Sequence, residues 1–254
     1  MSFVDAILLL AAGFAGGTVN AIAGGATFFT FPAMLAVGIP PVAANASNTV
    51  ALFPASLAAT IALRRELATT RQYLPRLVLV GLAGGIGGAF LLLATPDRAF
   101  LALVPWLLLL ATSVFAFSPR LLVWLRARSK GAHQGFRAGA ATLLLIAVCS
   151  VYGGYFGAGV GIMMMAGMTV AGLDDPHAAN ALKNLLAAAI NGIAVVIFVL
   201  KGIVVWPAAL TMLVGAVAGG VFGARLAQRI PAKVFRVIVI GIGSLLTVWY
   251  FLKA

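Results

Sequence analysis

The chain contains few charged residues and a single cysteine. Charged residues make up 9% of its 254 residues and hydrophobic residues 63%, whereas about a quarter of an average soluble protein is charged. So little polar surface cannot cover a soluble domain of this size, which predicts a protein embedded in a membrane. The single cysteine, Cys149, excludes a disulfide framework and a cysteine-based metal site.

The net charge of +12 would suit a protein that binds nucleic acid, but the distribution of the basic residues argues against this. They lie mainly in short connections between apolar segments, and in a membrane protein this pattern reports orientation. We therefore expect the lipid bilayer as a partner and no nucleic acid.

The two halves of the sequence align with each other at one constant offset. Segment 41–46 (PVAANA) matches segment 176–181 (PHAANA), 135 residues later, and the same offset aligns the glycine-rich residues 83–89 with residues 218–224. A duplicated, glycine-interrupted membrane sequence is typical of secondary transporters. We predict two membrane repeats, residues 1–119 and 136–254, joined by a basic linker over residues 120–135.

Each half contains five apolar segments, of which the second is short. A helix needs about 20 residues to cross roughly 30 Å of hydrocarbon. The third, fourth and fifth segments are long enough, whereas the second, with about 11 residues at about 1.5 Å each, reaches about half way and is predicted to be a half-helix. The segments cover roughly residues 4–23, 27–37, 43–63, 74–94 and 99–117 in the first half and 139–158, 162–172, 178–200, 207–228 and 234–252 in the second.

The basic residues predict opposite orientations for the two halves. In the first half they lie between the third and fourth segments and in the linker over residues 118–137, which the positive-inside rule places in the cytoplasm. In the second half the cluster follows the fourth segment instead. We therefore predict an all-α polytopic protein of a bacterial inner membrane, with ten segments in two inverted repeats and both termini outside. The clusters are Arg64, Arg65, Arg71 and Arg76 in the first half and Arg225, Arg229, Lys233 and Arg236 in the second.

A different count of the crossings stays open. If segments 27–37 and 162–172 were re-entrant loops, each half would cross the membrane four times and the repeats would be parallel. The cluster from Arg225 to Arg236 would then lie outside, against the positive-inside rule. The linker has two interpretations as well, because residues 121–125 (LLVWL) between arginines suit either a short helix on the anionic inner leaflet or a solvated loop.

Glycine-rich joints separate the first and second segments of each half. Glycine reaches backbone angles that other residues avoid, and a helix broken there exposes N–H groups at its new N-terminus. These donors and the helix dipole favour an anion. The alternative is that glycines only permit close helix packing, and we prefer that interpretation for the glycines of the fourth segments. The candidate binding residues of the joints are Asn20, Gly24, Gly25 and Thr27 in the first half and Gly157, Gly159 and Gly161 in the second.

Polar side chains form a stripe along the third segment of each half. In the second half the spacing i, i+3, i+4, i+11 places them on one helical face, and polar residues occupy the equivalent positions in the first half. Amide side chains in a membrane helix face a bundle interior or a cavity, because lipid cannot satisfy them. We expect the stripes to face each other across a binding site, with interhelical hydrogen bonding as the alternative. The stripes are Asn180, Lys183, Asn184 and Asn191, and Asn45, Asn48, Thr49 and Ser56.

Lys183 is the basic residue that lies deepest inside a predicted spanning segment, where it replaces Asn48 of the first half. A buried ammonium group needs a partner. No Asp or Glu occurs in the third, fourth or fifth segment of either half, so a substrate anion is a natural partner. The alternative is that the side chain extends to the interface beside Asp174 and Asp175.

Several catalytic signatures are absent from the sequence. It contains no HExxH, no GxSxG and no cluster of Cys and His, which disfavours an intramembrane enzyme. The missing intramembrane carboxylates disfavour a cation as the main substrate. We therefore expect a protein without enzyme activity, cofactor or metal.

The motifs at the joints and stripes carry a family resemblance. Segments 20–27 (NAIAGGAT), 31–35 (FPAML) and 38–45 (GIPPVAAN) resemble the opening of the TauE/SafE sulfite exporter family, with Ala26 in place of the third glycine of its common triple glycine. Segments 156–161 (FGAGVG), 181–186 (ALKNLL) and 215–224 resemble its second half. The resemblance implies export of sulfur-containing anions, such as sulfite or organosulfonates, across the inner membrane.

We therefore expect an exporter of small anions that works by alternating access at a midplane site. Lys183 would supply the positive charge, and freed backbone N–H groups would bind the substrate oxygens together with polar side chains. The alternatives are a transporter of another small solute or metal ion, and a membrane scaffold with no transported substrate. The expected side-chain donors are Thr27, Asn45, Asn48, Asn180 and Asn184.

Overall fold

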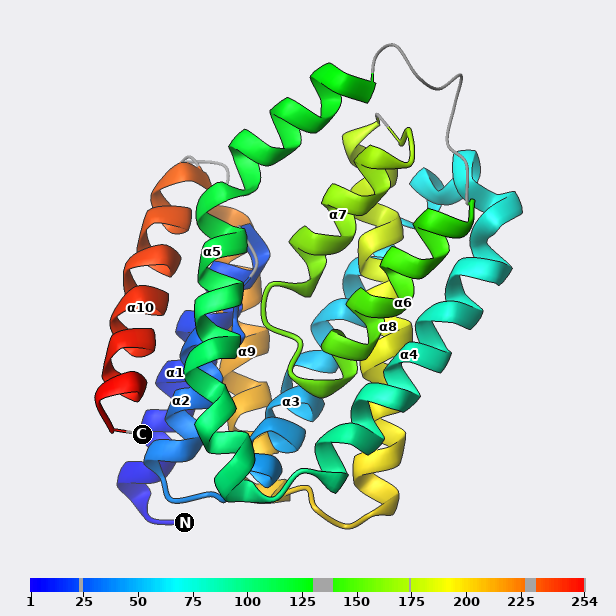
Figure 1. Cartoon of the computed structure of the whole chain (residues 1–254). Helices are drawn as coiled ribbons and strands as arrows, with labels where there is room; N and C mark the ends of the chain where they lie inside the picture. The colour runs from blue at the N-terminus through cyan, green and yellow to red at the C-terminus, as the bar shows by residue number, and fades with distance from the viewer. Residues whose placement is uncertain (23–24, 130–138, 174, 227–231, 254) are drawn as a thin grey trace.

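The computed structural model describes residues 1–22, 25–129, 139–173, 175–226 and 232–253, and these residues form helices and no strands (Figure 1). The all-α prediction is therefore confirmed for the described part of the chain. The helices of the first half are α1 (Phe3–Ile22), α2 (Thr27–Ala36), α3 (Pro41–Ala62), the 3₁₀ helix η1 (Arg64–Tyr73), α4 (Leu74–Ala94) and α5 (Asp97–Ser129). Those of the second half are α6 (Ala140–Tyr155), α7 (Val160–Val170), α8 (Pro176–Leu200), α9 (Trp206–Leu226) and α10 (Ala232–Lys253).

Six stretches within the described residues are long and apolar enough to cross a membrane. They confirm the predicted fourth and fifth segments of both halves and the third segment of the second half. Helix α3 has the predicted length of a span, with 22 residues, but is not among the six because it carries Asn, Ser and Thr along much of its course. The six stretches are Phe3–Ala21, Arg64–Ala94, Asp97–Ser118, Pro176–Leu200, Trp206–Leu226 and Val234–Lys253.

The two predicted half-helices are present as α2 and α7. With 10 and 11 residues, each is about 15–17 Å long, which is about half of the hydrocarbon thickness. Their short length places the glycine-rich joints well inside the bundle, and Figure 1 shows the connection between α6 and α7 at about mid-height.

The first part of the linker continues α5 and forms neither a separate surface helix nor a solvated loop. Helix α5 runs for 33 residues to Ser129, so the predicted boundary at residue 119 falls inside it. Figure 1 shows the last part of α5 bent away from the rest. Pro119 lies in this helix, and a proline inside a helix removes a backbone hydrogen bond and produces a kink. Residues 130–138 of the linker lie outside the described part.

The two halves are interleaved. Helix α1 packs along α9, and α4 packs along α6. The offset of 135 residues relates α1 to α6 and α4 to α9, so the first helix of each half pairs with the fourth helix of the other. Helices α3 and α8, which carry the polar stripes, also pack against each other. Neither half can therefore bury its helices without the other.

Glycines allow these helix pairs to approach backbone to backbone. A Cβ atom on Gly219 of α9 would overlap the carbonyl oxygen of Phe14 in α1, and one on Gly88 of α4 would overlap the carbonyl oxygen of Val151 in α6. Small residues drive such close packing in membranes, so the packing interpretation is confirmed at these positions. It was wrong for Gly220, which has nothing within 4 Å of the place where a Cβ would stand.

The helix directions in Figure 1 fit the inverted order. Helix α3 begins at the end of the bundle that holds both termini, and the equivalent α8 begins at the opposite end. The basic η1, the far end of α5, the end of α9 and the start of α10 all lie at the end opposite the termini. The orientation of the two halves in a bilayer stays a prediction.

Polar contacts between distant segments fix α3 and the ends of the bundle. The carboxylate of Asp97 accepts a hydrogen bond from the backbone N–H of Val42 at 2.8 Å, which satisfies one free donor at the start of α3. The hydroxyl of Ser47 accepts from the backbone N–H of Val205, at 2.9 Å, so α3 is also bound to the segment before α9.

The two neighbouring glycines of α9 give a matched test of the helix pairing. We expect Gly219→Ala to lower the stability of the protein by about 1–3 kcal/mol, because the added methyl group overpacks the interface with α1. Gly220→Ala should leave stability unchanged or raise it slightly, because alanine favours the helix by up to about 1 kcal/mol and meets open space. Thermal unfolding of the detergent-solubilised variants measures both, and equal melting temperatures would contradict the backbone contact.

Candidate functional site

The joint between α6 and α7 contains two backbone positions that require glycine. Gly157 has φ +81° and Gly159 has φ +76°, in the left-handed region that other residues adopt at a cost. The chain is held in this conformation by the hydroxyl of Tyr152, which donates to the carbonyl oxygen of Ala158 at 2.7 Å. No side chain caps the N-terminus of α7. The N–H groups of its first turn donate largely to the carbonyl oxygens of Gly157 and Gly159, so the joint faces the positive end of the helix dipole.

Asn45 of α3 joins the first half to this second-half joint. Its side-chain amide donates to the carbonyl oxygen of Tyr155, the last residue of α6, at 2.8 Å. Asn45 is 1% exposed and Asn48, one turn further along α3, is 2% exposed. Among the described residues, neither Oδ1 of Asn45 nor Oδ1 of Asn48 has a hydrogen-bond partner. The stripe of α3 therefore presents one buried acceptor at the joint and a second one turn further along the helix.

Lys183 of α8 also lies at this joint. Its aliphatic stem packs over Gly161 in the first turn of α7, so that a Cβ on Gly161 would stand 3.0 Å from Cδ and 3.7 Å from Cε of the lysine. Among the described residues its ammonium group has no hydrogen bond or ion pair. Asp175 is engaged elsewhere, because its carboxylate caps α8 by accepting from the backbone N–H of His177; Asp174 lies outside the described residues.

The other amides of the α8 stripe bond to each other along the helix. The side-chain amide of Asn184 donates to the backbone oxygen of Asn180 at 2.9 Å and lies 3.4 Å from its side-chain oxygen. Both residues are partly buried. They therefore occupy the same helical face as Lys183 but show local bonding in place of contacts with the joint.

The first joint has a different environment. Gly25 has φ +96°, but the nearest atoms to its position belong to Phe28, Phe115 and Val239. Thr27 is buried at the start of α2, whereas Asn20 is exposed at the end of α1. Gly24 lies outside the described residues. Among the residues predicted from sequence, the structure therefore gathers Asn45, Lys183 and the Gly157–Gly161 segment, and it surrounds Gly25 with apolar side chains.

Aromatic residues that were not predicted as part of the site enclose the second joint. Phe156 lies with its ring centroid 5.5 Å from that of Phe31 in α2, and the ring of Tyr155 lies 5.6 Å from that of Phe100 in α5. The run YGGYF at residues 152–156 was the available signal. Its two tyrosines and phenylalanine replace small or polar residues at the equivalent positions of the first half.

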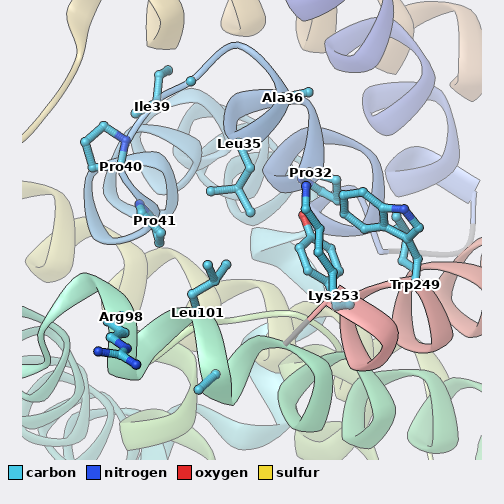
Figure 2. Close-up of a pocket in the computed structure, with 14 residues that line it drawn as sticks. Pro32, Leu35, Ala36, Ile39, Pro40, Pro41, Arg98, Leu101, Trp249 and Lys253 are labelled. Atoms are coloured by element: carbon cyan, nitrogen blue, oxygen red, sulfur yellow. The ribbon is translucent and has the colours of Figure 1, made fainter.

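A separate pocket of about 820 Å³ opens at the end of the bundle that holds the termini (Figure 2). Helices α2, α5 and α10 line it, with Arg98 and Leu101 on one side and Trp249 and Lys253 on the other. The ammonium group of Lys253 lies 4.7 Å above the ring of Trp249. Basic and tryptophan side chains are enriched where a membrane meets water, so we expect this end of the bundle at the interface. None of the predicted binding residues lines this pocket.

The described residues contain no group of three or more His, Cys, Asp or Glu side chains that could hold a metal ion. What the structure offers is a broken helix, a lysine and buried amides inside a bundle of membrane-length helices. Such half-helix termini at mid-depth are the binding elements of secondary transporters. The fold and the joint therefore define the class as multi-pass membrane transporters.

Comparison with known families gives the same class and a narrower group. The model of the family described as "Sulfite exporter TauE/SafE" matches residues 9–250, and the chain belongs to this family. A "Probable membrane transporter protein ORF9" from Sinorhizobium sp is 31% identical over 90% of this chain and 85% of its own length. A "Probable membrane transporter protein" from Haemophilus influenzae is 26% identical over 94% of this chain and 92% of its own. "Probable membrane transporter protein YfcA" from Escherichia coli K12 is 26% identical over 91% and 84%. No solved structure matches the chain.

Two tyrosines test which hydrogen bond holds the second joint. We expect Tyr152→Phe to lower stability by about 1 kcal/mol, because it leaves the buried carbonyl of Ala158 without its donor. Tyr155→Phe is the control, since its hydroxyl makes only a 3.4 Å contact with Thr95, and its effect should be smaller. Thermal unfolding in detergent compares the two, and a larger loss for Tyr155→Phe would show that the joint is held differently.

Proposed function

We propose that the chain exports small sulfur-containing anions, such as sulfite or organosulfonates, and binds them at the joint between α6 and α7. The observation that carries the proposal is that Asn45 of α3 and Lys183 of α8 both contact segment 155–161, in which α7 begins. Lys183 supplies charge and the N-terminus of α7 supplies the positive end of its dipole, and both favour an anion. The family to which the chain belongs supports the choice of a sulfur anion.

The same convergence weighs against the alternative substrates. A cation at this joint would meet the ammonium group of Lys183 and the positive end of α7. A scaffold without a substrate would have no use for a partly buried lysine that has no ion-pair partner among the described residues, because burying a charge is costly unless it is compensated. The same repulsion by positive charge disfavours a metal ion as the transported substrate.

The membrane potential provides a driving force for export. An inside-negative potential favours the outward movement of an anion by about 2.3 kcal/mol per charge per 100 mV. A uniporter of this kind needs no intramembrane carboxylate for proton coupling. Alternating access would then require that α6, α7 and their partners α4 and α8 move relative to the rest, so that the joint opens to each side in turn.

The proposed site predicts a specific role for Lys183. We expect Lys183→Ala to reduce sulfite or sulfonate efflux from proteoliposomes at least about tenfold, because a hydrogen bond to a charged group contributes about 1.5–3 kcal/mol. Lys201→Ala, which removes the exposed lysine at the other end of α8, is the matched control and should retain efflux. Full activity of Lys183→Ala in a folded sample would remove the lysine from the mechanism.

The efflux assay also separates the proposal from its alternatives. Liposomes loaded with sulfite, a sulfonate or chloride, with the potential set by a potassium gradient, should release the sulfur anions faster than chloride. Release that responds to the potential would identify charge movement. No release of any anion from a folded protein would favour the scaffold.

Equivalent cysteines in the two halves test the membrane orientation. Glu66 and Lys201 are exposed, and the offset of 135 residues makes them counterparts. In a Cys149→Ser background, we expect Lys201→Cys to react with an impermeant maleimide in intact cells and Glu66→Cys to react only after permeabilisation. This outcome is required by inverted repeats with a cytoplasmic η1, whereas labelling of both or neither would indicate parallel repeats.

A further inference from the structure

Two buried side-chain oxygens of α3 have no role in binding the charge of an anion. Within the part of the chain that the structure describes, the side-chain oxygens of Asn45 and Asn48 have no hydrogen-bond partner, although these residues are 1% and 2% exposed. Buried polar atoms are nearly always bonded, and an exception calls for an explanation. An anion cannot supply the partner through its own oxygen atoms, because these accept hydrogen bonds as the amide oxygen does.

The orientation of Asn45 is fixed by the joint. Its side-chain nitrogen donates to the carbonyl oxygen of Tyr155 at 2.8 Å, and the reversed amide would bring two oxygens together. The side-chain oxygen of Asn45 must therefore remain an acceptor. Asn48 lies three residues further along the same helical face, with its own unpaired oxygen.

The side chains of Asn45 and Lys183, which belong to different helices, contact the same short segment, residues 155–161. Asn45 contacts Tyr155 at the start of the joint, and Lys183 packs over Gly161 at its end. A ligand bound along segment 155–161 would therefore lie near both an ammonium group and an amide acceptor.

We infer that the site selects oxyanions that also carry a hydrogen-bond donor. This inference rests on the proposed function and narrows its substrate class. Hydrogen sulfite, with one O–H group, and hydroxy- or aminoalkanesulfonates belong to this class, whereas simple alkanesulfonates do not. The donor of the substrate pairs with the oxygen of Asn45, and the oxygen of Asn48 extends the same acceptor surface. A site with a buried acceptor rejects an analogue without the donor, because the acceptor is then left unpaired.

Two sulfonates of equal size and charge test the inference. 2-Hydroxyethanesulfonate and propane-1-sulfonate differ by a hydroxyl in place of a methyl group. We expect proteoliposomes with the full chain to release the hydroxy compound at least about tenfold faster at limiting concentration. Equal release of both sulfonates would overturn the inference and leave the proposed function intact. If neither sulfonate is released, and sulfite also stays inside the liposomes, the result would count against the proposed function itself.

Variants of the two asparagines test which residue discriminates between the two sulfonates. Asn48→Leu is nearly isosteric and removes an oxygen that has no partner, so it should fold and should reduce the ratio of the two release rates. Asn45→Leu should reduce the ratio further. Thr112→Val in α5 is the control, because Thr112 also carries a buried oxygen without a partner among the described residues. Its hydroxyl lies beside Gly243 of α10, whereas the neighbouring Ala111 packs against Gly159 of the joint, so its ratio should be unchanged. If Asn48→Leu and Asn45→Leu both keep the wild-type ratio, ordered water and not the substrate satisfies these oxygens.

Discussion

The need to satisfy a broken backbone inside an apolar layer governs the structure of this transporter. A helix interrupted at mid-bundle leaves polar groups that lipid cannot bond. At the second joint the protein supplies bonds from the Tyr152 hydroxyl and the Asn45 amide. Each of these groups belongs to an element whose position is fixed by other contacts. The joint therefore depends on α3 being held in place by Asp97 and Ser47, and the proposed site depends on the joint.

The interleaving of the halves explains why the site can form between them. Because α1 pairs with α9 and α4 with α6, each half places its joint against helices of the other. Asn45 of the first half can then bond to Tyr155 of the second. The glycine contacts between the paired helices are not part of the proposed site. They set the distance between the halves, and hence the distance at which Asn45 meets the backbone of Tyr155. A substitution in α9 that shifts this packing would therefore also shift the polar contacts at the joint.

The fold class, the half-helices and most membrane-length helices could be predicted from the sequence, because hydropathy and segment length determine them directly. The length of α5 could not, since the arginines after Pro119 are also compatible with a loop or a separate helix. The length of α3 agrees with the prediction, but a length criterion does not weigh the polar groups that make this helix less apolar than the other long helices. At the site, spacing on one helical face identified Asn45 and Lys183, but the carbonyl that Asn45 binds is a backbone group and leaves no mark in the sequence.

The two joints occupy equivalent places in the two halves but differ in their surroundings. Position 48 of the first half is Asn where position 183 of the second is Lys. Gly25 of the first joint lies among aromatic and aliphatic side chains, whereas Gly161, after the second joint, lies against the lysine stem. A duplicated protein with two identical sites would bind two anions close together and would have to offset their repulsion. With the lysine in one half only, the proposed function has a single anion site. The first joint interrupts the chain between α1 and α2 without a comparable charge, so we expect it to have a structural role.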